Sequence, residues 1–446
     1  MDSRVETPSY FRIIRLAIPI ILANSATPLL GLADTAVVGN FAHTVDLGGV
    51  ALGALVFSFL YWGFGFLRMS TTGFIAQAGG RQDPTEMVVI LWRALLLAFA
   101  IGCALILFQW PLREGAMSLL GASAAVEGIT RDYIHLRIWG APACLGNYVL
   151  TGFLIGRGQG RQLLLMQLLL NGVNIALDIL FAGYFHLGAP GIAVGTALAE
   201  WITLLAVGSL VWRQLQREAG IHWRALPWPR ILDRAQLRRT LGANGDIMIR
   251  TVLLLTGFAV FTDQGARFGD TILAGNHILL QFISFSAFFL DGFAFVTESQ
   301  VGQAAGNRRI DLFDATVKRS SVLAAITALL LSLGLWLGGA LAISLLTDIA
   351  PVRTTAIQYL PFACLYVLLS FMAFQLDGIF IGATGTRAMR NGSILSLAVF
   401  LLVSFPLIHR YGNAGLWTGF ILFVVARAIS LGIWFPGLRR RISSPY

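Results

Sequence analysis

Long apolar stretches separated by short polar segments make up most of this chain. Twelve of the stretches reach the roughly 20 predominantly apolar residues that a helix needs to cross a bilayer. They lie at about 13–40, 48–79, 89–110, 132–156, 162–184, 189–212, 240–263, 272–304, 320–347, 353–384, 390–409 and 414–437. A long polar interval at 213–239 leaves six predicted spans on each side. The pattern predicts an all-α polytopic membrane protein.

Composition supports the membrane assignment. Of 446 residues, 57% are hydrophobic and 12% are charged, whereas a soluble domain carries about 25% charged residues. A soluble protein this poor in charge would lack the polar surface to cover itself. The three cysteines all lie in apolar stretches, which argues against a secreted disulfide scaffold. The same hydrophobicity excludes intrinsic disorder.

The net charge of +10 could indicate a nucleic-acid partner, but its distribution indicates membrane topology instead. With the N-terminus in the cytoplasm, 21 Lys and Arg residues fall in cytoplasmic segments and 5 in outward segments. Seven of the 21 lie within 213–239. We therefore expect a multi-pass protein of the plasma (inner) membrane with both termini cytoplasmic. Basic loops would contact anionic lipids, and no nucleic-acid partner is expected.

Motifs for enzymatic chemistry are missing from the sequence. The one lysine, Lys318, does not stand in the Gly-x-x-x-x-Gly-Lys-Ser/Thr pattern of a nucleotide-binding loop. The six histidines form no metal-ligand pattern, and no nucleophile elbow occurs. We expect neither an enzyme nor a protein with a cofactor or a resident metal.

An internal repeat links the two halves. Two pairs of blocks share an offset of 226 in residue number, and a third pair has an offset of 224. These blocks are 77–80 with 303–306, 152–156 with 378–382, and 191–195 with 415–419. Because each half has an even number of spans, both halves enter the membrane in the same direction. The sequence thus predicts two pseudo-symmetric six-helix lobes, 1–212 and 240–446, joined by a basic cytoplasmic loop at 213–239, as in two-lobed secondary transporters.

Acidic and polar side chains inside the first six spans are candidates for function, because an ionisable group at membrane depth costs about 2.5–3.5 kcal/mol. Asp34 lies deep in span 1. Asn174 and Asp178 are i,i+4 in span 5 and share a helical face, and Thr196 and Glu200 lie one turn apart in span 6. These groups could form an oxygen-rich site for H⁺ or Na⁺. The alternative is that they hold helices together through hydrogen bonds.

Proton uptake at such a site would remove a charge, because burial favours the neutral form of a carboxyl group. The surrounding helices could then respond. Pro19 and Pro28 are candidate bending points in span 1, since each removes one helical hydrogen bond. The alternative is that these prolines are ordinary residues of a transmembrane helix.

The second half carries different residues at the matching positions. Val260 and Ser404 stand where the first half has its two aspartates. Asp246 and Arg250, at i,i+4, favour a structural ion pair over a binding site.

Four further charged residues are candidates for the cavity wall or for secondary proton binding. Asp291 and Glu298 are i,i+7 on span 8, Asp377 lies in span 10, and Arg68 lies in span 2. Helix-end or ion-pair roles are equally open for the three acids. Arg68 and Arg427 are expected to pair with acids across the bundle.

These residues together resemble the multidrug and toxic compound extrusion (MATE) transporters over essentially the whole chain. The specific pieces are Ala33-Asp34-Thr35 with Val38-Gly39, Asn174-x-x-x-Asp178, and the paired stretches 77–80 and 303–306. Residues 66–72, Phe-Leu-Arg-Met-Ser-Thr-Thr, resemble the DinF branch of the family.

The resemblance implies an antiporter that exports small organic compounds, often cationic or amphipathic, as H⁺ or Na⁺ enters. It implies cation coupling at Asp34, Asn174, Asp178 and Thr196, with Na⁺ held by these four residues as an alternative to H⁺. It also implies that the span-1 helix bends at Pro19. Small organic substrates and membrane lipids are the expected partners, and a monomer is the expected state.

Two other functions remain open from the residues. One is a lipid-linked oligosaccharide flippase of the wider superfamily, which would need basic residues to bind a pyrophosphate. The intramembrane charges here are mostly acidic. The other is a passive channel, which the absence of symmetric rings of acids disfavours.

Overall fold

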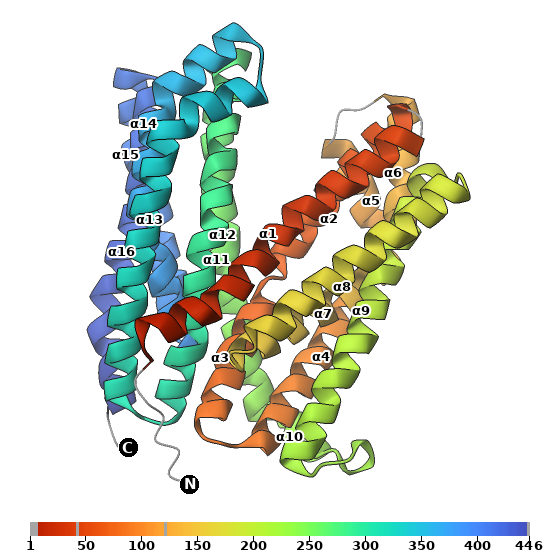
Figure 1. The fold of residues 1–446 in the computed structure, drawn as a ribbon, viewed down its shortest axis with the longest axis vertical. Coiled ribbons are helices and arrows are strands. Elements are labelled where there is room, and N and C mark those ends of the chain that lie inside the picture. Colours follow the sequence, from red (N-terminus) through yellow and green to blue (C-terminus); the bar gives the residue numbers. More distant parts are fainter. Residues whose placement is uncertain (1–7, 42–43, 120–122, 444–446) are drawn as a thin grey trace. The chain divides into compact units, whose positions relative to one another are not determined.

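The computed structural model describes residues 8–41, 44–119 and 123–443, and it describes side chains outside 27–45, 119–122 and 223 (Figure 1). Every regular element in these ranges is helical. In the first half the α-helices are α1 (Tyr10–Phe41), α2 (Thr44–Gly63), α3 (Phe66–Gly80), α4 (Pro84–Leu107), α5 (Gln109–Leu119), α6 (Ala124–Arg137), α7 (Ala141–Gly156), α8 (Gly160–Asp178), α9 (Gly188–Ala219) and α10 (Trp228–Ile231). In the second half they are α11 (Arg234–Ala266), α12 (Asp270–Gly306), α13 (Ile310–Leu346), α14 (Ala350–Gly382), α15 (Thr386–Tyr411) and α16 (Asn413–Ser443).

The helices account for the predicted membrane spans. Within the described residues, eleven helical segments are long and apolar enough to cross a bilayer. Two of them join consecutive helices, Asp46–Gly80 over α2 and α3 and Ala124–Gly156 over α6 and α7. Helix α1 is also long enough at 32 residues, and with it the count reaches the twelve that the sequence predicts.

The polar interval 213–239 is more helical than a loop. Helix α9 continues to Ala219 and α11 begins at Arg234, because Arg, Gln and Glu are strong helix formers. Between them, the short α10 is fixed to α4. Arg93 donates from Nε to the carbonyl of Ile231 (3.0 Å) and from Nη2 to the carbonyl of Arg230 (2.8 Å).

The chain packs as two compact units. We call Leu22–Leu241 the N-terminal unit, and Gly242–Tyr446 together with Met1–Ile21 the C-terminal unit. The start of α1 belongs to the latter. There Arg319 donates to the carbonyl of Pro8 (2.7 Å) and lies 5.9 Å from the ring centre of Tyr10. The predicted N-lobe at 1–212 includes this segment, whereas the compact units group it with the second half. The boundaries of the two lobes stay a prediction.

Glycine contacts repeat within the two units at the shift found in the sequence. In the N-terminal unit, Gly152 and Gly156 of α7 lie against the carbonyls of Arg68 and Thr72 in α3. In the C-terminal unit, Gly378 and Gly382 of α14 lie against the carbonyls of Ala294 and Glu298 in α12. A Cβ at any of the four would come closer than 3.0 Å to the facing carbonyl oxygen. Every residue in one set is 226 positions from its counterpart, so the two units repeat the same close helix packing.

Turns repeat at the same shift. Gln82 after α3 and Arg308 after α12 both have positive φ, at 55° and 56°. The pair Gly158 and Thr384 and the pair His186 and Gly412 also have positive φ. Three matching turns support the internal repeat independently of the glycine contacts.

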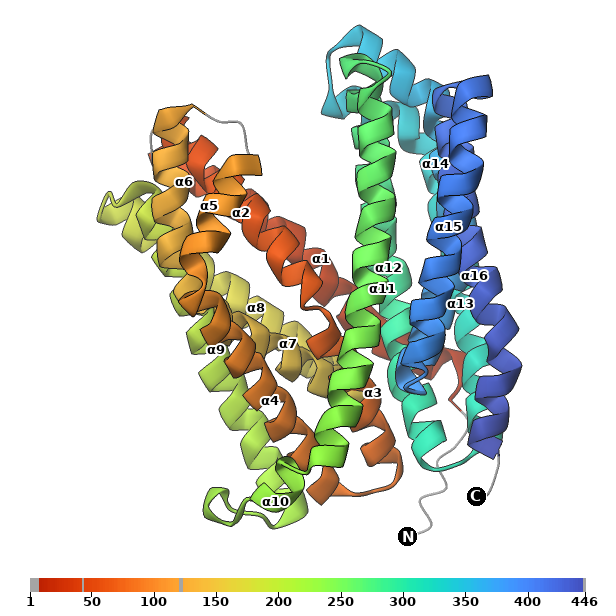
Figure 2. The same ribbon diagram turned by 180° about the vertical axis from the view of Figure 1, so that it is seen from behind.

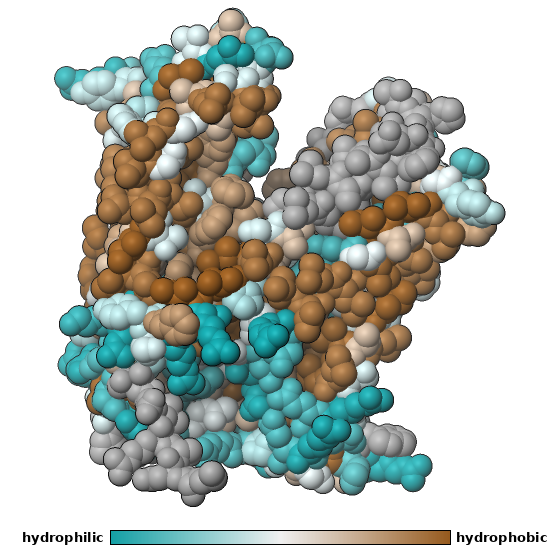
Figure 3. Space-filling model, viewed as in Figure 1, coloured by the Kyte–Doolittle hydropathy of each residue, from teal (hydrophilic) through white to brown (hydrophobic). Residues whose placement is uncertain are grey.

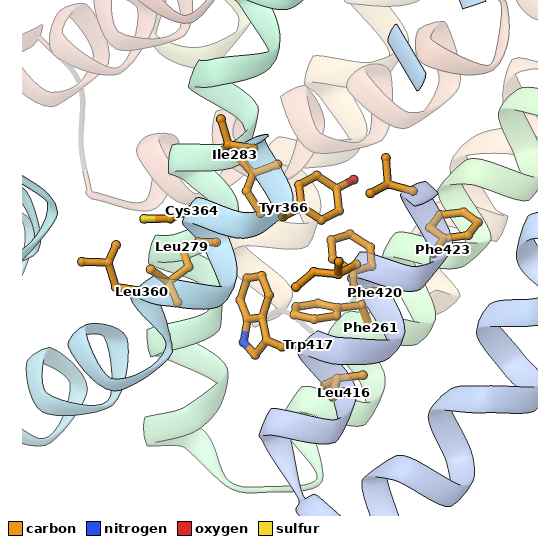
Figure 4. Close-up of a cluster of buried hydrophobic side chains, with 14 of the residues drawn as sticks. Phe261, Leu279, Ile283, Leu360, Cys364, Tyr366, Leu416, Trp417, Phe420 and Phe423 are labelled. Atoms are coloured by element: carbon orange, nitrogen blue, oxygen red, sulfur yellow. The ribbon is translucent and has the colours of Figure 1, made fainter. Parts of the chain in front are cut away.

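An aromatic cluster fills the core of the C-terminal unit (Figure 4). The ring of Phe420 lies 4.5 Å from that of Phe261 and stacks on Tyr366 at 4.8 Å. Trp417, fully buried, donates from Nε1 to the side-chain oxygen of Asn276 (2.9 Å). Helices α15 and α16 pack side by side within this unit (Figures 1 and 2).

Large apolar side chains also cover the outer surface of the helices (Figure 3). On α13, Leu337 and Leu345 are 76% and 80% exposed, and Leu402 on α15 is 75% exposed. A continuous apolar surface of this kind marks contact with a membrane rather than with water.

Candidate cation-coupling site

Two of the predicted site residues meet in α8 of the N-terminal unit. Asn174 and Asp178 are both fully buried. The side-chain amide of Asn174 donates to Oδ2 of Asp178. The i,i+4 spacing brings them onto one face, which confirms that part of the prediction.

Helix α9 approaches this carboxylate at a glycine. A Cβ at Gly195 would meet Oδ1 of Asp178 at 2.5 Å, so only a residue without a side chain lets α9 come so near. Directly after Asp178 the chain forms a π-helical segment, Ile179–Tyr184. Such segments occur often at functional sites. The sequence did not indicate this one, because a π turn has no clear periodicity signal.

Thr196 follows Gly195, but its hydroxyl is used within its own helix. It donates to the carbonyl of Ile192 at 2.9 Å, and the residue is 8% exposed. Thr196 therefore lies next to Gly195, which faces Asp178, while its hydroxyl group is hydrogen-bonded within α9. Coordination of an ion by this hydroxyl stays a prediction.

The span-1 residues are only partly described. Asp34 lies in the helical range of α1, but its side chain lies outside the described residues. The helix continues through Pro19, whose side chain is half-buried, and a hinge there stays a prediction. Asn171 connects α8 to α1, since its amide donates to the carbonyl of Ala26 (3.0 Å), a little over two helical turns before Asp34.

Glu200, one turn after Thr196 on α9, forms a buried ion pair. Its carboxylate binds Arg137 of α6 through two hydrogen bonds, Nη1 to Oε2 at 2.8 Å and Nη2 to Oε1 at 2.5 Å. Glu200 is therefore engaged in an ion pair and stands apart from the predicted set of Asp34, Asn174, Asp178 and Thr196. Arg137 lies inside a predicted span, but the two partners stand on different helices, far beyond the reach of any helical spacing rule.

The acids of the C-terminal unit also form ion pairs. Asp377 binds Arg250 and lies 3.7 Å from the guanidinium of Arg427, which confirms that Arg427 pairs with an acid across the bundle. Asp246 binds Arg390 (2.6 Å) instead of the predicted Arg250. This pair joins α11 to α15, whereas the predicted pair would have lain along α11.

The structure gives the burial of the three remaining charged candidates, Asp291, Glu298 and Arg68, but not their roles. Glu298 is buried and Asp291 half-buried in α12, and Arg68 is half-buried in α3. All three have interaction partners, so none is a free charge. Their roles stay predictions.

No group of three His, Cys, Asp or Glu side chains that could hold a metal occurs among the described residues. A cavity of about 360 Å³ lies between α11 and α12, lined by Phe261, Leu273, Leu280 and His277, with Asp270 at its edge. Its lining is mostly apolar, and its volume is at the lower end of the range for small-molecule sites.

Comparisons with known proteins agree with the repeat and the fold. The sequence profile of the MatE family matches twice, at 19–180 and 247–408. The offset between the two matched ranges is close to the shift that relates the glycine contacts.

Individual relatives match over nearly their whole length. DNA damage-inducible protein F of Escherichia coli (strain K12) is 38% identical over 94% of this chain and 90% of its own length. The probable multidrug resistance protein NorM of Acinetobacter baylyi is 24% identical over 92% of each chain. A solved multidrug resistance MATE transporter in an outward-facing conformation has the same fold, with a TM-score of 0.83, 21% identity and coverage of 97% and 95%. The chain therefore belongs to the MatE family of multi-pass membrane transporters, in which it is similar to DinF.

Proposed function

We propose that this transporter is a secondary active antiporter that exports organic, cationic or amphipathic compounds in exchange for H⁺, with Na⁺ as the alternative coupling ion. Coupling takes place at Asp34, Asn174, Asp178 and Thr196 in the N-terminal unit. One relative is named a probable multidrug resistance protein, which supports compound efflux as the role. The protein works as a monomer in the inner membrane with both termini in the cytoplasm.

The burial of Asp178 is the observation that carries this proposal. The residue at the matching position of the C-terminal unit is Ser404, which faces Gly419 as Asp178 faces Gly195. The two units thus share the same backbone approach but not the same chemistry. A buried carboxyl group is a costly replacement for a hydroxyl in a membrane protein, and cation coupling gives a reason for it.

Protonation of Asp178 would change what its side chain can do. The ionised carboxylate only accepts hydrogen bonds, as it does from Asn174, whereas the neutral acid also donates one. Loss of the charge also removes the cost of burying it. The π-helical segment and the close α9 helix directly adjoin this group, so a change there reaches both elements.

Transport in inside-out vesicles tests the proposal. Vesicles are energised with either a proton or a sodium gradient, and uptake of a fluorescent cationic dye is followed. We expect D34N and D178N to lose gradient-driven uptake, and S404N, the matched change in the other unit, to retain it. Wild-type rates in both aspartate variants would overturn the coupling assignment, and the gradient that drives uptake identifies the ion.

A lipid-linked oligosaccharide flippase is the second candidate. The observation in its favour is that two arginines, Arg250 and Arg427, surround the single carboxylate of Asp377 inside the C-terminal unit. Arginine suits the recognition of a pyrophosphate. Purified protein in liposomes that scrambles a lipid-linked sugar and moves no dye would establish this function instead.

A further inference from the structure

The N-terminal unit contains a buried ion pair that the proposed coupling chemistry does not use. Arg137 and Glu200 are 6% and 5% exposed and meet in a bidentate arrangement. The guanidinium lies over two rings of α2, 5.2 Å from the centre of Phe57 and 5.6 Å from that of Tyr61. The pair therefore joins α2, α6 and α9 at one point.

Span 4 changes its geometry at this pair. Helix α6 ends at Arg137, the three residues Ile138–Gly140 form a 3₁₀ turn, and α7 follows. A Cβ at Gly140 would meet Oε2 of Glu200 at 2.5 Å and Nη1 of Arg137 at 2.7 Å. Nearly two turns into α7, Asn147 donates to the backbone carbonyl of Glu200 (2.9 Å). Both sides of the 3₁₀ turn are thus bound to the same residue of α9.

The C-terminal unit contains the apolar equivalent of this arrangement. Residue 363, which matches Arg137, is alanine, and residue 424, which matches Glu200 at the 224 shift of this helix, is valine. Tyr366 stands in place of Gly140. Ala363, Tyr366 and Val424 all belong to the aromatic cluster.

The register of this comparison at Arg137 is fixed by contacts on both sides of it. Gly49 faces Ile129 in the N-terminal unit, and Gly275 faces Thr355 in the C-terminal unit. Gly49 is 226 positions from Gly275, and Ile129 is 226 positions from Thr355. The Gly152 and Gly378 contacts, further along the same spans, are related by the same shift. The fold therefore accommodates apolar residues at these positions, and packing alone does not require the ion pair.

We propose that Arg137 and Glu200 are positioning residues for cation coupling. Glu200 lies on α9 about one turn after Gly195 and Thr196. Together with the hydrogen bond from Asn147, the ion pair fixes α9 to both parts of span 4 and so holds the α9 backbone against the carboxylate of Asp178. This inference rests on the proposed coupling role of Asp178.

The titratable groups around the pair come from three helices. They are Tyr61 of α2, Tyr133 of α6, and Cys144 and Tyr148 of α7. Tyrosine and cysteine side chains are ordinarily neutral at pH 7, so Arg137 and Glu200 themselves supply the two opposite charges at this point. The pair serves as a fixed contact rather than as a second proton carrier.

The test removes both charges at once while keeping the volume. The variants are the apolar pair R137M/E200L and the neutral, hydrogen-bonding pair R137Q/E200Q. Both are compared with wild type and with D178N. Thermal unfolding in detergent and dye binding by the purified protein report folding. Dye uptake driven by the coupling ion, measured as a function of pH, reports coupling.

We expect both double variants to unfold near the wild-type temperature and to bind dye, but to lose about tenfold of gradient-driven uptake, with a displaced pH profile. A double variant with the wild-type rate and pH profile would overturn the positioning role. If D178N also couples normally, the proposed coupling role of Asp178, on which this inference rests, fails. If D178N is uncoupled and the double variants are not, only this inference fails.

Discussion

At the scale of single residues, the partner of each buried charge distinguishes its role. Asp178 accepts a hydrogen bond from the neutral side-chain amide of Asn174. Glu200 instead accepts two hydrogen bonds from the guanidinium of Arg137. The first environment suits a coupling group and the second suits a fixed contact.

This difference predicts a strongly non-additive mutational cycle at the ion pair. R137M alone or E200L alone leaves one charge buried without its partner, which typically costs about 3–5 kcal/mol. Replacing both residues with apolar ones of similar size is expected to cost much less, since such changes are often neutral. Unfolding of the four proteins in detergent gives the coupling free energy. Additive effects of the two substitutions would contradict the pairing.

The sequence was enough to predict that Asn174 and Asp178 share a helical face, because they lie one helical turn apart. It could not find the partners of Glu200 or Asp377, because those pairs span 63 and 127 residues of sequence. Helical spacing relates neighbours on one helix and carries no information about which faces of two helices meet. The Asp246 prediction failed for the same reason, since its partner Arg390 lies on another helix.

At the scale of elements, the four glycines of α7 and α14 set how closely spans 4 and 10 approach their neighbours. Each of them faces a backbone carbonyl, which cannot move aside as a flexible side chain can. Small residues at such contacts are typical of membrane helix packing. The repeated blocks in the sequence therefore mark packing positions, and the structure explains why these short stretches align between the two halves.

A methyl group added at one of these contacts should destabilise the protein. In G378A, the new Cβ would lie 2.6 Å from the carbonyl oxygen of Ala294, and we expect a loss of about 1–3 kcal/mol, as for other overpacked cores. The control is G334A in α13, where nothing lies within 4 Å of the added atom. That change should be neutral or gain up to about 1 kcal/mol from helix propensity. Equal unfolding temperatures for the two variants would rule out the close contact.

At the scale of the whole molecule, the order of the helices could be read from the sequence and their ends could not. The predicted spans match the observed membrane-spanning segments in number and order, but α9 and α11 extend well into the polar interval at 213–239. Hydropathy reports the part of a helix that lies in lipid, whereas the backbone hydrogen bonds continue as long as the residues favour a helix. Arg, Gln and Glu do so here.

The same whole-chain pattern predicts orientation, because basic residues are concentrated in every second connecting segment. We place single cysteines at two exposed positions, H222C between α9 and α11 and D348C between α13 and α14, in a chain whose native cysteines are replaced by alanine. Three membrane crossings, α11, α12 and α13, separate the two positions, so they must lie on opposite sides. A membrane-impermeant maleimide should label D348C in intact cells, and H222C only after permeabilisation. The reverse pattern would show that the termini face outward and that the arginine bias does not set the topology of this transporter.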